Sequence, residues 1–195
     1  MRHERISFDD VRLRDLALDD LDAYVDYWHD PANTALDALG IDRANVYPAK
    51  KMREMLALTI ASNAKLETSR QPTVCIVFRG RTIGVHELTE LHPGDSAVMH
   101  AHIWNHELRG LGIGLVSYVK AMELYFERFA LATIRFETPK INAGANRIKE
   151  KLGLRARGSG VFNLPMLRHA VETNTYVVER AMLPALVKKV SAGWS

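Results

Sequence analysis

The sequence contains a single cysteine, Cys75, among its 195 residues. It therefore cannot form an internal disulfide, which excludes a disulfide-stapled secreted domain. Cys75 lies in the strand-like run TVCIVF, where a lone cysteine is typical of a small buried apolar residue. No apolar run reaches the roughly 20 residues that a membrane-spanning helix needs, and the start MRHERISFDDVRLRDL lacks the apolar core of a secretory signal. We expect a cytoplasmic protein without a membrane as partner.

An excess of charge of one sign is also missing, since 26 basic and 23 acidic residues leave a formal net charge of +3. The basic residues are scattered, whereas nucleic-acid binders usually present a dense basic face. We therefore expect no nucleic-acid partner. The 47% hydrophobic and 25% charged residues are typical of an ordinary globular protein, and the length allows one domain with a sizeable core.

Hydrophobic periodicity predicts strands and helices that alternate along the whole chain. A helix is expected over 49–66, and Arg79-Gly80-Arg81 is expected to form a hairpin turn. The expected parts are a strand, two helices and a three-stranded meander in 11–104; a loop, helix, strand and second helix in 105–153; two final strands in 154–183; and a tail in 184–195. We predict a single α/β domain over 1–195, with a mixed, mostly antiparallel sheet of about six to seven strands and flanking helices.

A glycine-rich loop, RGLGIG, leads directly into one of the predicted helices at Arg109 to Gly114. Glycines allow a ligand to approach the free N–H groups of a helix N-terminus, where the helix dipole favours an anion. Arg109 adds a cation suited to phosphate oxygens. The alternative is a tight turn without a ligand. A Walker loop is excluded because the chain has no Gly-Lys pair, and the dinucleotide fingerprint is disfavoured because Leu115 replaces its third glycine.

Two segments together resemble a known family, the GNAT (GCN5-related) N-acetyltransferases. Arg109-Gly110-Leu111-Gly112-Ile113-Gly114 matches the family's Arg/Gln-x-x-Gly-x-Gly/Ala loop, which holds the pyrophosphate of acetyl-CoA. The segment NAGANRIKEKLGL (142–154) is similar to the family's second CoA-contacting helix. The segment HIWNHELRG before the loop most resembles the branch that modifies ribosomal-protein N-termini and many small amines.

The resemblance implies that acetyl-CoA is the co-substrate and that no metal is needed. Acetyl-CoA would bind in a V-shaped splay between the strands at 97–104 and 132–139. Asn142 would hydrogen-bond the pantetheine arm, and Ala145 would keep the groove clear. Lys149 and Lys151 lie with Arg147 on the second helix, where some could meet the 3′-phosphate; the alternative is a solvated helix face. The strand before the loop would pair with pantetheine through the backbone of His102, Ile103 and Trp104.

Acetyl transfer from a thioester to an amine needs a base for the amine. His100 and His102 share side-chain parity on one strand, whereas His86 and Glu87 face opposite sides of the neighbouring strand. We predict His100 as the base, because the family's arylalkylamine branch resembles this chain in placing a histidine nine residues before the loop's arginine. Glu87, acting through a water, is the second candidate, and a purely structural role is the alternative for each. A His-x-His metal site is disfavoured because no third ligand follows.

The chain departs from the family at the general acid. Many members carry a tyrosine seven residues after the helix asparagine, and Lys149 occupies that position here. Tyr118 and Ser117 lie one turn into the loop's helix. Neither stands out as a replacement, so the proton donor to the leaving thiolate stays open.

Two variable connections, 29–48 and 163–170, are expected to wall the acceptor side without identifying the amine. Candidate lining residues are Trp28, His29, Asp30, Met166 and His169.

We predict an acetyl-CoA-dependent N-acetyltransferase that moves the acetyl group directly to a primary amine in a ternary complex, because Cys75 is expected in a buried strand. The alternative is a non-catalytic acyl-CoA sensor or binding module on the same fold, which the missing tyrosine favours. The final strands of such folds often pair across subunits, which allows a homodimer.

Overall fold

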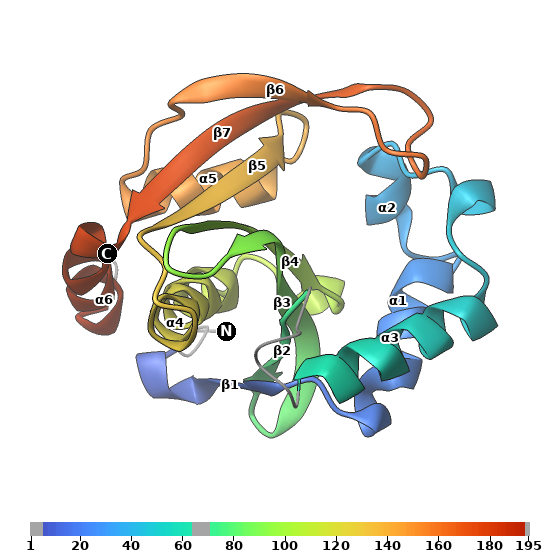
Figure 1. Ribbon diagram of the computed structural model, residues 1–195, viewed down its shortest axis with the longest axis horizontal. Coiled ribbons are helices and arrows are strands. Elements are labelled where there is room, and N and C mark those ends of the chain that lie inside the picture. Colours follow the sequence, from blue (N-terminus) through green and yellow to red (C-terminus); the bar gives the residue numbers. More distant parts are fainter. Residues whose placement is uncertain (1–5, 64–70, 194–195) are drawn as a thin grey trace.

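One seven-stranded sheet runs through the computed structural model, which describes residues 6–63 and 71–193 (Figure 1). The strands lie in the order β1-β2-β3-β4-β5-β7-β6, and every neighbouring pair is antiparallel except β4 and β5. The predicted mixed, mostly antiparallel sheet is therefore confirmed. The strands are β1 Val11–Asp15, β2 Thr73–Phe78, β3 Arg81–His92, β4 Ser96–Ile103, β5 Thr133–Pro139, β6 Gly158–Phe162 and β7 Val171–Glu179.

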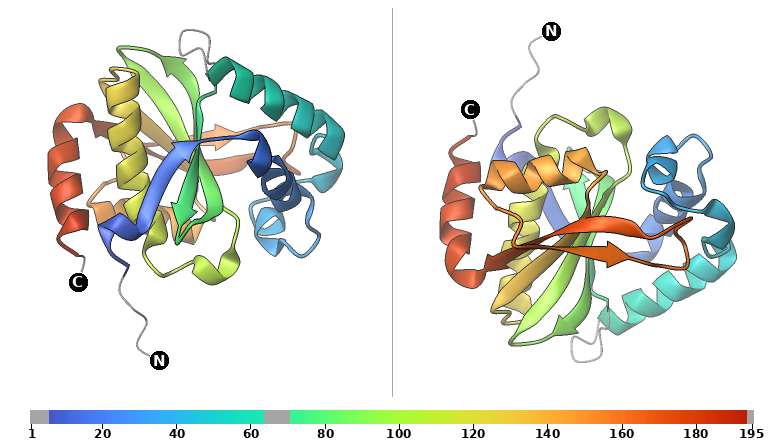
Figure 2. Two further views of the ribbon diagram at one scale, coloured as in Figure 1. Left: turned by 90° about the horizontal axis from the view of Figure 1, so that it is seen from below. Right: turned by 90° about the horizontal axis from the view of Figure 1, so that it is seen from above.

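Helices cover both faces of this sheet, with α4 and α6 on one side and α1 and α3 on the other (Figure 2). The helices are α1 Leu21–His29, α2 Thr34–Ala38, α3 Ala49–Asn63, α4 Ile113–Arg128, α5 Ala143–Leu152 and α6 Leu183–Ser191. The end of the helix predicted over 49–66 lies outside the described residues. In 6–63 and 71–193, no helix combines the length and apolar character needed to cross a bilayer.

Helix α4 lies at the centre of the core. Its sequence LVSYVKAMELYF predicts one apolar face, but most of its residues are buried because α6 packs against its outer side. Leu186 and Val190 of α6 are 5% and 2% exposed. Tyr125 of α4 donates its hydroxyl hydrogen bond toward the carbonyl oxygens of Pro72 and His86, at 3.2 and 2.8 Å. The tail thus completes the core around the helix that follows the glycine loop.

Strands β4 and β5 pair only over their first halves. The parallel ladder joins Ser96–Val98 to Thr133–Arg135 and stops there. Beyond that point β4 stays paired with β3 as far as Ile103, and β5 stays paired with β7 as far as Pro139. The predicted V-shaped splay is confirmed, and each of its two arms keeps an edge of backbone groups that the other arm does not satisfy.

Gly84 allows β3 to approach β4 along one arm of the V. A Cβ atom at this position would lie 2.2 Å from the carbonyl oxygen of His102 and 3.0 Å from Cα of Ile103. The β2–β3 register also shifts beside Gly84, at Ile76/Val77. A side chain at Gly84 would therefore push β4 away from β3.

We expect Gly84→Ala to lower the free energy of unfolding by about 2 kcal/mol, because the added methyl group overlaps backbone that cannot rotate away. Gly158→Ala is the matched control, since a Cβ there meets only Thr175 Cβ at 3.9 Å. Urea unfolding of both variants measures the difference. Equal stability of the two variants would show that β4 accommodates the methyl group.

Candidate active site

The glycine loop forms the N-terminus of α4. Gly110 and Gly112 have φ values of 81° and 93°, in the left-handed region that favours glycine. Gly112 is the N-cap, and the first backbone bond of the helix runs from the Val116 N–H to the Gly112 carbonyl. In the described part of the chain, the amides of 113–115 have no backbone acceptor. They are available as donors to an anion at a helix N-terminus.

Gly114 brings this helix end close to α5 and to the end of β4. A Cβ there would lie 2.8 Å from Cδ1 of Ile148 on α5 and 3.4 Å from Cδ1 of Ile103 on β4. Arg109 is exposed, and its Nη2 donates to the Ile103 carbonyl at 3.3 Å. The loop is thereby attached to the arm of the V that β4 forms.

Asn142 and Ala145 lie where β5 ends and α5 begins. The Asn142 Oδ1 atom caps the helix by accepting from the Ala145 N–H at 3.1 Å. Its Nδ2 group makes no hydrogen bond within the residues described. Asn146 fixes the helix start by donating to the carbonyls of Pro139 and Asn142, both at 2.9 Å. The two motifs found in the sequence therefore meet at the open end of the V.

The basic residues of α5 have different environments. Arg147 and Lys151 are exposed, so their predicted contact with a 3′-phosphate stays a prediction. Lys149 is 1% exposed, and its Nζ donates to the Tyr118 hydroxyl oxygen at 2.8 Å. The prediction that Lys149 meets the 3′-phosphate from the helix surface is wrong, because its ammonium group lies in the core.

Lys149 lies among aromatic rings and has no carboxylate partner among the described residues. Its Nζ is 4.0 Å from the centroid of the Tyr118 ring and 4.9 Å from that of Phe136. Burial lowers the pKa of Lys149 to about 7 and raises the pKa of the Tyr118 phenol. Lys149 therefore titrates near neutral pH.

His86 and Ser117 lie beside Tyr118 on the same face of the sheet. His86 Nε2 is 3.0 Å from Ser117 Oγ, and the His86 ring meets the Tyr118 ring edge-on at 5.0 Å. Burial, followed by the charge of Lys149, lowers the pKa of His86 to about 3. His86 Nδ1 is buried without a hydrogen-bond partner among the described residues. This histidine is neutral at physiological pH.

Glu87 faces the other side of the sheet, as the predicted parity requires, and pairs with a histidine. Its Oε1 is 3.7 Å from His102 Nε2, and its Oε2 accepts from Tyr24 at 3.4 Å and from Gln71 at 3.3 Å. Burial raises the pKa of Glu87, but the hydrogen bond and charge of His102 outweigh burial and hold it below its usual value. In 6–63 and 71–193, no three His, Cys, Asp or Glu side chains are arranged to hold a metal.

The two histidines of β4 share this face but have different partners. His100 Nε2 lies 2.8 Å from Thr89 Oγ1, and burial lowers the pKa of His100. His102 Nδ1 lies 3.4 Å from the Tyr27 hydroxyl, while its other nitrogen faces Glu87. The sequence predicts a role for His102 through its backbone only. Glu87 is paired in register with His100, and His102 lies two residues further along β4 on the same face, diagonal to Glu87. The sequence shows that His100 and His102 share a face, but the pairing with Glu87 depends on the register between the two strands.

Aromatic rings surround the Glu87–His102 pair. Trp28 packs against the His102 ring at 5.2 Å and against Tyr27 at 5.4 Å, and Tyr24 meets Trp104 edge-on at 6.0 Å. Helix α1 supplies three of these rings at helical spacing. The pair is therefore partly shielded from water, with His102 21% exposed at its side chain.

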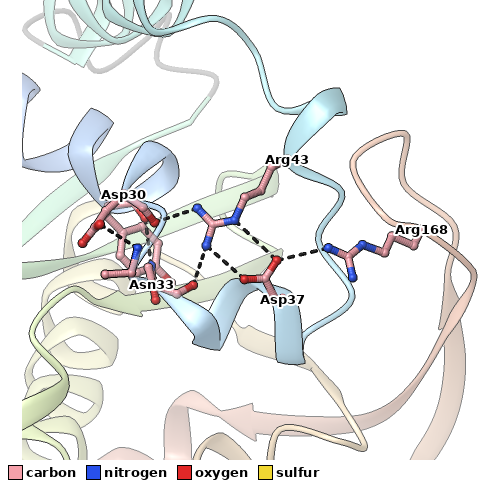
Figure 3. A network of polar contacts seen from close by, with 7 residues as sticks. Asp30, Asn33, Asp37, Arg43 and Arg168 are labelled. Atoms are coloured by element: carbon pink, nitrogen blue, oxygen red, sulfur yellow. Dashed lines mark hydrogen bonds and ion pairs between the residues drawn. The ribbon is translucent and has the colours of Figure 1, made fainter.

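The two segments predicted to wall the acceptor side are joined by polar contacts (Figure 3). Arg43 donates to the carbonyls of Asp30 and Asn33, both at 2.6 Å. Asp37 accepts from Arg43 at 3.2 Å and from Arg168 of the β6–β7 loop at 3.1 Å (Figure 3). Backbone bonds from Asp42 N to the Met166 carbonyl and from Arg168 N to the Gly40 carbonyl, at 2.7 and 2.9 Å, reinforce the junction.

The predicted lining residues divide into two groups at this junction. Trp28 and Met166 are partly buried and pack against one apolar cluster. His29, Asp30 and His169 are exposed. The His29 ring bonds the Tyr47 carbonyl at 3.1 Å, and the Asp30 carboxylate caps the Ala32 N–H at 2.8 Å. The side chains of His29 and Asp30 therefore stabilise their own segment.

Residues 10–155 match a family model described as an acetyltransferase (GNAT) domain. Similar solved structures include RimJ of Mycobacterium smegmatis in complex with CoA-disulfide, at TM-score 0.76 and 18% identity over 94% of this chain and 89% of that chain. RimL, a ribosomal L7/L12 alpha-N-protein acetyltransferase in complex with coenzyme A, has a TM-score of 0.69 and 16% sequence identity. The match covers 87% of this chain and 94% of that chain. Spermidine N-acetyltransferase SpeG of Vibrio cholerae has a TM-score of 0.68 and 17% sequence identity. The match covers 90% of this chain and 96% of that chain. A comparison with curated protein sequences gives no match.

The buried charge of Lys149 predicts a pH-dependent stability. Its pKa is about 7 in the folded protein against an ordinary value of 10.5, so the unfolded chain binds more protons between these two pH values. The free energy of unfolding should therefore rise with pH across this window, by up to about 1.4 kcal/mol per pH unit from this group.

Lys149→Met should be more stable than the parent at pH 7, with a difference that shrinks toward pH 10. Urea unfolding at several pH values measures it. Lys151→Met, on the exposed side of the same helix, is the matched control and should leave the pH dependence unchanged. A constant difference between parent and Lys149→Met would show that Lys149 titrates normally.

Proposed function

Because the chain belongs to the GNAT acetyltransferase domain family, we propose that it is an acetyl-CoA-dependent N-acetyltransferase whose acceptor is a primary amine. The acetyl group passes directly from the thioester to the amine in a ternary complex. The observation that carries the proposal is the V between β4 and β5, with the glycine loop and Asn142 at its open end and the Glu87–His102 pair on its acceptor side.

The residues at the V have the chemistry that CoA requires. The free amides of 113–115 and the left-handed glycines before them suit a pyrophosphate at a helix N-terminus, with Arg109 as the adjacent cation. Beyond Val98, the edge of β4 is not paired with β5, and this edge suits the amides of a pantetheine arm, which add to an edge as a strand does. Of the predicted segment His102 to Trp104, the Ile103 carbonyl already accepts from Arg109 and the Trp104 N–H donates to the Ile83 carbonyl. Asn142 Nδ2 is a further donor beside the arm. Bound acetyl-CoA supplies the activated acetyl thioester.

We assign the general base to His102, oriented by Glu87. Attack requires a neutral amine, and a histidine is suited to accept its proton near neutral pH. A buried carboxylate that faces one ring nitrogen orients the ring and stabilises its protonated form, as in the Ser-His-Asp triad. The other β4 histidine, His100, has its Nε2 bound to Thr89. This contact favours His102 for the role that the sequence suggested for His100.

Direct transfer is supported by the position of the only cysteine. Cys75 is fully buried, and its thiol donates to the Asp20 carboxylate at 3.4 Å. Burial, followed by the charge of Asp20, raises the pKa of the Cys75 thiol. Since the thiolate is the nucleophilic form, Cys75 is poorly suited to carry an acetyl group between the donor and the amine.

A non-catalytic acyl-CoA sensor on the same fold is the second candidate. Lys149 stands where many members of the family carry a tyrosine, and this substitution favours the sensor. An amine library incubated with acetyl-CoA separates the two candidates, because the enzyme releases free CoA thiol with at least one amine. Binding of acetyl-CoA without thiol release on any amine would favour the sensor.

Gly110→Glu should weaken acetyl-CoA binding at least tenfold, because a carboxylate at the loop repels the pyrophosphate. Gly94→Glu is a matched control: both glycines have φ of 81°, and at both the position that a Cβ would occupy has no atom within 4 Å. The backbone strain is therefore the same in both variants. Calorimetry measures the affinity, and equal affinities would remove the loop from the CoA site.

His102→Gln should lower kcat about 100-fold or more, as expected for loss of a general base. His100→Gln serves as the comparison and should retain most activity. Acetyl-CoA binding by each variant controls for folding. The opposite ranking of the two variants would return the base to His100.

A further inference from the structure

The buried contact between Lys149 and Tyr118 has no part in the function proposed so far. Within the described residues, Lys149 forms no ion pair with an Asp or Glu, although it is 1% exposed. A buried charge without a counter-ion destabilises a fold, and a methionine of similar length would fill the same space without this cost. Packing alone therefore does not account for a lysine at this position.

The contact lies where the two arms of the V separate. The β4–β5 ladder stops at Val98 and Arg135, and the next residue of β5 is Phe136. The Phe136 ring lies 5.6 Å from the Tyr118 ring and 4.9 Å from Lys149 Nζ. Tyr118 also meets the ring of His86, which is paired in register with Ala101 of β4. Tyr118 and Lys149 thus lie against both arms, on the sheet face opposite Glu87 and His102.

The hydrogen bond between the two side chains has a direction. Lys149 has only donors, so Tyr118 Oη accepts from its Nζ at 2.8 Å. The hydrogen that Tyr118 itself carries has no acceptor in the part of the chain that the structure describes. Lys149 Nζ therefore donates to Tyr118 Oη, and the Tyr118 hydroxyl can in turn donate its own hydrogen to a further acceptor.

We propose that Tyr118 protonates the leaving sulfur of CoA and that Lys149 restores the proton to Tyr118. This rests on the proposed acetyl transfer. The amine nitrogen forms its bond to the thioester carbonyl carbon and loses a proton to His102. The C–S bond breaks, and the sulfur leaves with the bonding pair and takes the Tyr118 hydroxyl hydrogen. A proton moves from Lys149 Nζ to Tyr118 Oη, and solvent returns both His102 and Lys149 to their starting states.

The acidities of Lys149 and the CoA thiol favour a concerted relay in which both protons move together. Burial lowers the pKa of Lys149 to about 7, below the value of about 8.5 for an ordinary thiol, so a proton passes downhill from Lys149 to the thiolate. Burial raises the pKa of Tyr118, so Tyr118 gives up its hydrogen only as Lys149 Nζ supplies another, and no free phenolate forms. The other titratable group that faces Lys149 is His86 on β3, and burial, followed by the positive charge of Lys149, lowers the pKa of His86.

Tyr118→Phe tests the proposal in the full chain with acetyl-CoA and an amine found by the library screen. We expect kcat to fall about 100-fold or more, with KM for acetyl-CoA unchanged. Tyr125→Phe is the matched control: it is the same substitution in the same helix, at a buried tyrosine whose hydroxyl bonds only backbone carbonyls. It should lower stability and leave kcat within about twofold.

Lys149→Met should lower kcat similarly and abolish the decline of kcat above neutral pH, because the group that must be protonated is then missing. The double variant Tyr118→Phe/Lys149→Met removes both polar groups and should lose no more activity than Tyr118→Phe, since the two residues act as one unit. It also carries the test if Tyr118→Phe alone fails to fold, because it leaves no buried charge unpaired.

The outcomes separate this proposal from the function on which it rests. An active parent enzyme with Tyr118→Phe equal to Tyr125→Phe in kcat and pH profile would overturn the proton-delivery role and leave the acetyltransferase intact. A parent that binds acetyl-CoA but acetylates no amine would overturn the proposed function, and this role with it.

Discussion

The end of the β4–β5 ladder is the constraint on which the rest of the site depends. The two parallel strands share hydrogen bonds over Ser96–Val98 and Thr133–Arg135 only. Each strand is then held by its other neighbour, so the arms are rigid although they do not pair with each other. The glycine loop continues from one arm, and Asn142 follows the other. A fully paired sheet would leave no free backbone edge for the pantetheine arm that we propose there.

The sheet also divides the proposed chemistry between its two faces. Alternation along β3 directs Glu87 toward α1 and His86 toward α4. The proposed base and the aromatic rings of α1 lie on the first face. Lys149 and Tyr118 lie on the second face, beneath the helices that hold the proposed CoA site. A thioester held between the arms would face a proton acceptor on one side and a proton donor on the other.

The fold and the cofactor loop could be predicted from sequence because their signals are local. Glycine spacing, strand alternation and the helix that ends at Gly153 are each visible within about a dozen residues. The roles of single side chains were less accessible. Lys149 lies between exposed Arg147 and Lys151 in a basic stretch, and only the packing of α5 against Tyr118 and Phe136 shows that it points inward. The partner of His102 likewise depends on the register between β3 and β4, which no single-strand pattern encodes.

The Asp37 carboxylate constrains how the segments proposed to wall the acceptor side can be exchanged. It holds Arg43 of its own segment and Arg168 of the β6–β7 loop, which are distant in sequence (Figure 3). The two segments proposed to wall the acceptor side are therefore joined in space although they are distant in sequence. Exchange of one wall for that of a homologue would leave an arginine or an aspartate without its counterpart. Recombination or engineering that replaces these segments therefore has to transplant both of them together.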